Sequence, residues 1–209
     1  MANIAIFLDG TWNDPKDRTS VYRLADAIVA RTDVLGPQRC YYAVGVGNKP
    51  FQKFRGGAFG MGVSTTVLEA YRWLVAQYEE GDHVFIFGFS RGAYTARSLA
   101  GLIARCGLLR RQYGDRAGAI YERYRRDMQV ERIDELEYIL RHNKRPLTPD
   151  EKRLLTESRR IEIEMIDVCD TVGSLGIPWS AAPIFGPKDY YFLNTRPSEL
   201  YPHCFHALA

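Results

Sequence analysis

The sequence predicts an α/β fold, with a mostly parallel sheet flanked by helices, and three observations support this prediction. Short apolar runs of strand length recur along the chain, separated by stretches in which apolar residues have helical spacing. The run 84–88 is apolar at four of five positions, which is typical of a buried parallel strand, and it leads into the helical pattern of 93–106. The 209 residues, 46% of them hydrophobic, suffice for one domain with its own core.

Four elements are expected before this central strand. The apolar run 4–8 predicts a first strand. A helix capped by Thr19 or Ser20 follows and ends before the Gly-Pro pair at 36–37. Residues 40–46 resemble a second buried strand, and 63–78 carry apolar residues along one helical face.

A charged helical region is expected after the central helix. Its three segments cover about 116–128, 131–143 and 149–159. We predict that residues 108–159 form either a cap over the site or an insertion between strands. A further β-rich apolar run, 161–168, then returns the chain to the sheet.

The central strand ends in Gly88-Phe89-Ser90-Arg91-Gly92, a Gly-x-Ser-x-Gly motif that indicates a nucleophile elbow. A sharp strand-to-helix turn lifts the Ser90 hydroxyl clear of the sheet, where a base can reach it. Gly88 and Gly92 avoid the side chains that would collide as strand and helix fold back. The backbone N–H of Arg91 opens the helix and would help to hold a substrate oxyanion. The alternative is an ordinary connection in which Ser90 only caps the helix.

A second part of the site is expected just after the first strand, at Asp9-Gly10-Thr11. The carboxyl ends of parallel strands line the ligand crevice, so the N–H groups of Gly10 and Thr11 would lie across from Arg91 and complete an oxyanion hole. An equally good interpretation is a tight turn in which Asp9 and Asn13 satisfy their own backbone. In either case we expect Asp9 to organise the turn rather than to react.

Asp170 is the candidate acid of a catalytic triad. It follows the run 161–168, at the carboxyl end of a predicted strand, and the order serine, acid, histidine is that of α/β-hydrolases. Asp167 competes with it, but a side chain three positions earlier in the strand points to the opposite face. The other interpretation of Asp170 is that it only forms a turn.

The base is the least determined member of the triad. Only His203 and His206 follow the acid, and His206 is our candidate. A packing role is the competing interpretation. The sequence shows no final strand that would deliver the base before Ala209.

Charge and composition narrow the function classes. A net charge of +3, from 28 basic and 25 acidic residues, does not support a nucleic-acid partner. The four cysteines are scattered in or beside apolar runs, which predicts reduced, buried thiols rather than a zinc or redox site. The N-terminus lacks the features of a signal peptide, so we expect synthesis in the cytoplasm, with export by a signal-independent route still open.

Four motifs occur in an order found in one protein family: LDGTWN at 8–13, YAVGVG at 42–47, GFSRGAYTAR at 88–97 and DTVGSLG at 170–176. In these the chain resembles a bacterial α/β-hydrolase family of largely uncharacterised proteins that includes type VI secretion phospholipase effectors. The resemblance assigns Ser90 as nucleophile and Asp170 as acid. It places the expected base beyond the HALA sequence at 206–209, and so implies a single α/β-hydrolase-like domain, 1–209, truncated at its C-terminus.

The resemblance implies a serine ester hydrolase, a lipase or phospholipase A-type enzyme that needs no metal or cofactor. Its substrate would be an acyl ester or phospholipid, and its partners a membrane surface and a secretion-apparatus or immunity protein. The glycine-rich stretch 45–62, with interleaved basic and aromatic residues, would meet an anionic or lipid surface or be an ordinary solvated loop. The alternative function is a catalytically incomplete module that binds lipid or a protein partner.

Overall fold

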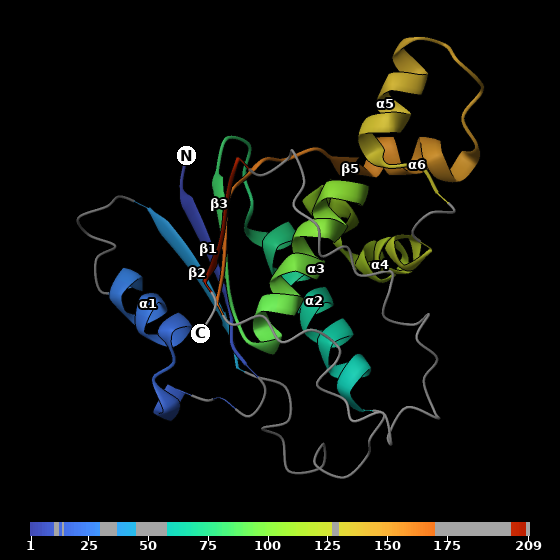
Figure 1. Cartoon of the computed structure of the whole chain (residues 1–209). Coiled ribbons are helices and arrows are strands. Elements are labelled where there is room, and N and C mark those ends of the chain that lie inside the picture. Colours follow the sequence, from blue (N-terminus) through green and yellow to red (C-terminus); the bar gives the residue numbers. More distant parts are fainter. Residues whose placement is uncertain are drawn as a thin grey trace.

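A parallel sheet organises the computed structural model of the chain (Figure 1), which describes residues 1–10, 13, 15–29, 37–44, 58–126, 130–169 and 202–207. Its five described strands lie in the order β2-β1-β3-β6-β7, and every neighbouring pair is parallel. The strands are β1 (Asn3–Leu8), β2 (Gln38–Ala43), β3 (His83–Phe89), β6 (Ile163–Cys169) and β7 (His203–Ala207). This architecture confirms the predicted α/β fold.

Helices cover both faces of the sheet. Figure 1 shows α1 (Ser20–Val29) on one face, and α2 (Ala58–Gln77) with α3 (Arg91–Cys106) on the other. The larger apolar core lies under α2 and α3, and a smaller one lies under α1. Because β1 and β3 are covered on both faces, their sequences are nearly continuous apolar runs, which explains why both could be predicted.

The strand β7 was not predicted. Its sequence, His-Cys-Phe-His-Ala, is exposed along its whole length and carries no pattern of alternating apolar and polar residues. The expectation that the cysteines are buried is therefore wrong for Cys204, which lies in this exposed strand, and holds fully only for Cys106. Only the pairing of β7 with β6 identifies it as a strand, since Met165 to Cys169 lie in register with His203 to Ala207. The expectation that no further strand follows the acid is therefore wrong.

The region 108–159 begins and ends at a short antiparallel pair, β4 (Leu108–Leu109) with β5 (Ser158–Arg159). Between them lie a 3-10 helix, Arg111–Arg116, and the helices α4 (Ala117–Arg125), α5 (Ile133–Arg141) and α6 (Pro149–Glu157). The region thus connects the end of α3 to the start of β6, and the pairing of β4 with β5 brings its two ends together.

Within this region, α5 and α6 lie toward the end of α3 opposite Ser90 (Figure 1). α5 contacts the C-terminal end of α3, where a guanidinium N–H of Arg105 donates to the carbonyl of Val130 at 3.3 Å. With 16 residues, α3 is about 24 Å long, so the described parts of α5 and α6 do not cover its first turn. This position fits an insertion between strands. The division of the chain into domains stays a prediction.

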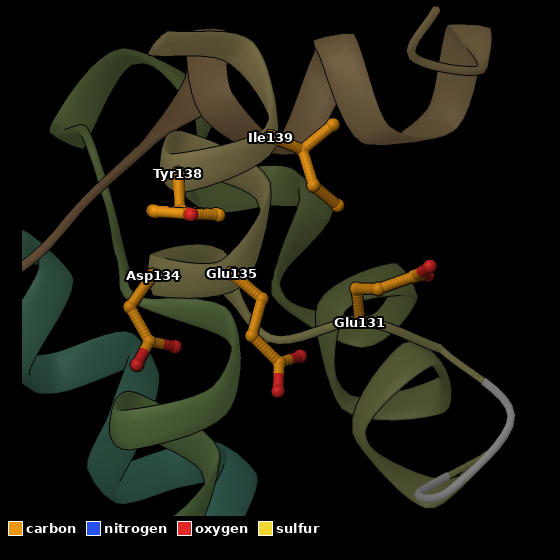
Figure 2. Close-up of a pocket in the computed structure, with 5 residues that line it drawn as sticks. All are labelled: Glu131, Asp134, Glu135, Tyr138 and Ile139. Carbon is orange, nitrogen blue, oxygen red and sulfur yellow. The ribbon is translucent and has the colours of Figure 1, made fainter. Parts of the chain in front are cut away.

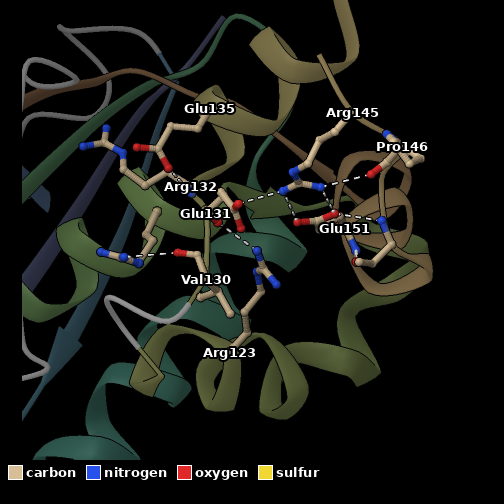
Figure 3. Close-up of polar contacts among 10 residues, drawn as sticks. Arg123, Val130, Glu131, Arg132, Glu135, Arg145, Pro146 and Glu151 are labelled. Carbon is tan, nitrogen blue, oxygen red and sulfur yellow. Dashed lines mark hydrogen bonds and ion pairs between the residues drawn. The ribbon is translucent and has the colours of Figure 1, made fainter. Parts of the chain in front are cut away.

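Arg145 links the segment just before α5 to α6 (Figure 3). Its guanidinium donates to the carboxylates of Glu131 and Glu151, at 2.7 Å each, while the backbone N–H of Thr148 donates to Glu151 at 2.8 Å. The hydrogen bond from Arg145 holds the pKa of Glu151 at about 2, far below its usual 4.5, although burial opposes this shift.

We expect Glu151→Gln to lower the free energy of unfolding by about 2 kcal/mol at neutral pH, since the amide cannot replace a carboxylate between charged and backbone donors. The pKa of Glu151 is lower in the folded chain, so its contribution is present above pH 4.5 and is lost as the pH falls toward 2. Urea unfolding at pH 7 and at pH 3 measures both effects. Glu122→Gln, at the exposed pair with Arg125, is the control and should change little. Equal losses in the two variants would contradict this assignment.

No helix in the described part of the chain is both long and apolar enough to cross a membrane.

Candidate active site

Ser90 lies in the strained turn between β3 and α3, with φ 53° and ψ −118°. The turn is held from both sides, because the N–H of Ser90 donates to the carbonyl of Cys169 at 2.9 Å and the N–H of Ala93 donates to the carbonyl of Ser90 at 3.1 Å. The Ser90 side chain makes no capping hydrogen bond to the helix. This geometry argues against the interpretation in which Ser90 only caps α3, and strain of this kind is common at functional sites.

Three glycines allow the backbone to close around Ser90. A Cβ on Gly92 would lie 2.7 Å from the carbonyl oxygen of Asp9 and closer still to that of Leu8. A Cβ on Gly88 would lie 2.6 Å from the carbonyl oxygen of Gly92. A Cβ on Gly10 would lie 3.2 Å from that of Ser90. The end of β1, the end of β3 and the start of α3 therefore meet backbone to backbone, as predicted for Gly88 and Gly92.

Asp9 is the buried polar centre beside this junction, with 6% of its surface exposed. Its carboxylate accepts the N–H of Gly10 at 2.7 Å, the hydroxyl of Thr19 at 2.7 Å and the hydroxyl of Tyr42 at 2.6 Å. Thr19 and Tyr42 could not be predicted as partners from the sequence, because they are 10 and 33 positions away and no local pattern connects them to Asp9. The bonds agree with the expectation that Asp9 organises the turn.

The backbone N–H groups predicted to form the oxyanion hole belong to Arg91 on one side and to Gly10 and Thr11 on the other. Arg91 is the first residue of α3, so its N–H lies at the positive end of the helix, where a negatively charged oxygen is stabilised. The N–H of Gly10 is already donated to Asp9, and Asn13 donates its own N–H to the carbonyl of Gly10 at 3.0 Å. The tight-turn interpretation therefore describes Gly10 better. Thr11, the other predicted donor, lies outside the described residues.

Asp170 also lies outside the described residues, although its chain neighbour Cys169 accepts the N–H of Ser90. Its competitor Asp167 lies within β6 in register with Phe87, three residues before Ser90, so it is about 10 Å back along the strand direction. Burial raises the pKa of Asp167 above its usual value. Asp167 is therefore poorly placed to orient a base at the end of β3.

The two candidate bases lie on opposite faces of β7. His206 is in register with Val168, which is in register with Gly88, so β6 separates His206 from the elbow strand. Two strand spacings amount to about 9.6 Å between backbones. Ser90 and His206 are both described, and no hydrogen bond joins them. His203, three residues earlier beside Met165, is farther from the carboxyl edge of the sheet.

A cavity of about 480 Å³ lies elsewhere, at the start of α5 (Figure 2). Its lining carboxylates already have partners: Glu131 binds Arg145, while Asp134 and Glu135 bind the side chain and the backbone N–H of Arg132. Within the described ranges, no group of three or more His, Cys, Asp or Glu side chains is arranged to hold a metal ion. Because its carboxylates are already paired, this pocket is a weaker candidate than the elbow.

A parallel sheet whose central strand turns through Gly-x-Ser-x-Gly into a buried helix defines an α/β-hydrolase-like protein. Residues 2–209 match the model of the family described as "T6SS, Phospholipase effector Tle1-like, catalytic domain", and the chain belongs to this family. The resemblance seen in the four sequence motifs is thereby confirmed.

A curated relative is the uncharacterized protein YEL023C of Saccharomyces cerevisiae, which is 28% identical over 227 residues. The alignment covers 99% of this chain and 30% of the relative, so the chain spans about a third of that protein's length. No solved structure matches the chain.

Proposed function

We propose that this chain carries the nucleophile of a serine hydrolase that cleaves acyl esters of phospholipids. The observation that supports this most is the Ser90 turn, where a positive φ keeps the hydroxyl at the start of a buried helix without a capping role. The family to which the chain belongs is described as phospholipase effectors, which supports a lipid ester as substrate.

In the proposed reaction the Ser90 hydroxyl attacks the acyl carbonyl and gives its proton to a histidine. The N–H of Arg91 stabilises the oxyanion, together with a donor from the segment that follows Asp9. The histidine then protonates the leaving alcohol as the ester C–O bond breaks. Water, activated by the same histidine, hydrolyses the acyl-serine. Asp170 orients the histidine, and His206 is our candidate for it.

A catalytically incomplete module that binds lipid or protein is the second candidate function. It is favoured by one observation, the missing hydrogen bond between His206 and Ser90. The first proposal includes a secretion-apparatus or immunity protein as partner, which co-purification would test. It also includes export after synthesis in the cytoplasm.

Covalent labelling with a fluorophosphonate tests the hydrolase proposal. We expect labelling of the wild-type chain at Ser90, no labelling of Ser90→Ala, and labelling at least about tenfold slower in His206→Ala. Labelling that is equally fast in His206→Ala would place the base elsewhere. A folded wild-type chain that does not label, yet binds phospholipid vesicles, would favour the binding module.

A further inference from the structure

We propose that Tyr42 and Thr19 are positioning residues of the active site, because through Asp9 they hold the backbone of Gly10 against Ser90. This inference rests on the proposed hydrolase function, since it assigns these residues a role in the reaction of Ser90. They touch neither the nucleophile nor any reacting atom.

The two oxygens of the Asp9 carboxylate accept hydrogen bonds from different donors. One oxygen of Asp9 accepts the N–H of Gly10, and the other accepts the hydroxyls of Thr19 and Tyr42. All three donors are neutral, and the carboxylate is almost fully buried. In the part of the chain that the structure describes, hydrogen bonds from neutral groups stabilise this carboxylate. It depends on each of them, because the low dielectric strengthens every bond and makes every loss costly.

The two hydroxyl donors come from different elements of the fold. Tyr42 belongs to β2, whereas Thr19 precedes α1 and also accepts the N–H of Tyr22 at 3.1 Å. The N–H of Asp9 itself donates to the carbonyl of Ala43 at 3.1 Å. Tyr42, on the neighbouring strand, and Thr19, at the start of α1, therefore fix the direction of the Asp9 side chain from two sides.

The direction of the Asp9 carboxylate also affects the surroundings of the nucleophile, through Gly10. The Asp9 oxygen that does not bind Thr19 or Tyr42 accepts the N–H of Gly10. Gly10 in turn packs so close to Ser90 that a Cβ added to Gly10 would lie 3.2 Å from the Ser90 Cβ. If the carboxylate turns, the Gly10 amide must move with it or lose its acceptor. Displacements of about an ångström beside a nucleophile cost much of the rate.

A purely structural role is the competing explanation, and Tyr41 provides a matched control. Tyr41 is the neighbour of Tyr42 on β2 but faces the other side of the sheet, where its ring packs on Trp73 with centroids 5.2 Å apart. Tyr41→Phe and Tyr42→Phe each remove one hydroxyl from a half-buried ring on the same strand. Only Tyr42→Phe removes a bond to Asp9.

The test is steady-state hydrolysis of a p-nitrophenyl ester, well below the melting temperature of each variant. We expect Tyr42→Phe to lower kcat about tenfold with KM unchanged, because the lost bond is to a charged group. Thr19→Val should do the same, Thr19→Ser should restore the rate, and Tyr41→Phe should behave as wild type. A Tyr42→Phe variant that melts earlier than wild type but keeps its kcat would overturn the inference.

Hydrogen exchange of the Gly10 amide gives a second measurement that needs no activity. We expect exchange to be about tenfold faster in Tyr42→Phe than in Tyr41→Phe. If the wild-type chain does not hydrolyse the ester or label at Ser90, the proposed function fails. An unchanged exchange rate at Gly10 would instead overturn the positioning role, whether or not the chain is active.

Discussion

Ser90→Ala is expected to lower kcat for ester hydrolysis by about 10⁴-fold or more, since the residual rate would come only from binding and the oxyanion donors. The fold should persist, because the Ser90 side chain makes no capping bond and alanine fits the same space. Ester hydrolysis and melting temperature, measured on the same preparation, check both parts.

Ser90→Gly is the companion variant. Glycine adopts a φ of 53° without steric cost, so this change should raise the free energy of unfolding by about 1 kcal/mol while also abolishing hydrolysis. Gain of stability with loss of activity is the signature expected of a strained nucleophile. Activity that survives in both variants would place the chemistry at another residue.

Gly92→Ala is expected to have the largest effect on stability, a loss of about 3 kcal/mol or more. The added methyl group would meet the carbonyl oxygens of Leu8 and Asp9, which are backbone atoms at the end of a central strand and cannot rotate away. The start of α3 would have to move off β1, which also displaces Ser90 from Gly10. Urea unfolding measures the loss.

Gly118→Ala is the matched control, because a Cβ there would have no neighbour within 4 Å. This glycine lies in α4, where alanine is the better helix former, so stability should rise by up to about 1 kcal/mol. If Gly92→Ala were tolerated as well as Gly118→Ala, the close approach of α3 to β1 would be refuted.

The elbow could be predicted because its chemistry is local. An apolar run, two glycines and a serine lie within ten residues. The run forms the strand, and the glycines permit the sharp turn that presents the serine. The partners of Asp9 could not be predicted in the same way. Tyr42 and Thr19 reach it only because β2 pairs with β1 and α1 packs across both strands. Hydrogen bonds between residues so far apart leave no periodic signal in a sequence.

The same distinction applies to the two histidines and to Gly10. His203 and His206 were visible as candidates, but only the pairing of β7 with β6 shows that a whole strand separates His206 from the elbow. The sequence made Gly10 a plausible oxyanion donor, but in the structure its N–H donates to the carboxylate of Asp9. In both cases the sequence suggested a residue type, whereas its geometry depended on the fold.

The sequence by itself determined the α/β class, the central strand with its Gly-x-Ser-x-Gly turn and the family, because apolar periodicity and contiguous motifs are properties of neighbouring residues. Only the tertiary structure decided the exposed strand β7, the position of α5 and α6 away from Ser90, and the hydrogen-bonded cluster on Asp9. The physical reason is that strand register, packing direction and long-range hydrogen bonds form only when distant segments meet. Their free energy comes from contacts between segments, so no single segment of the sequence determines them.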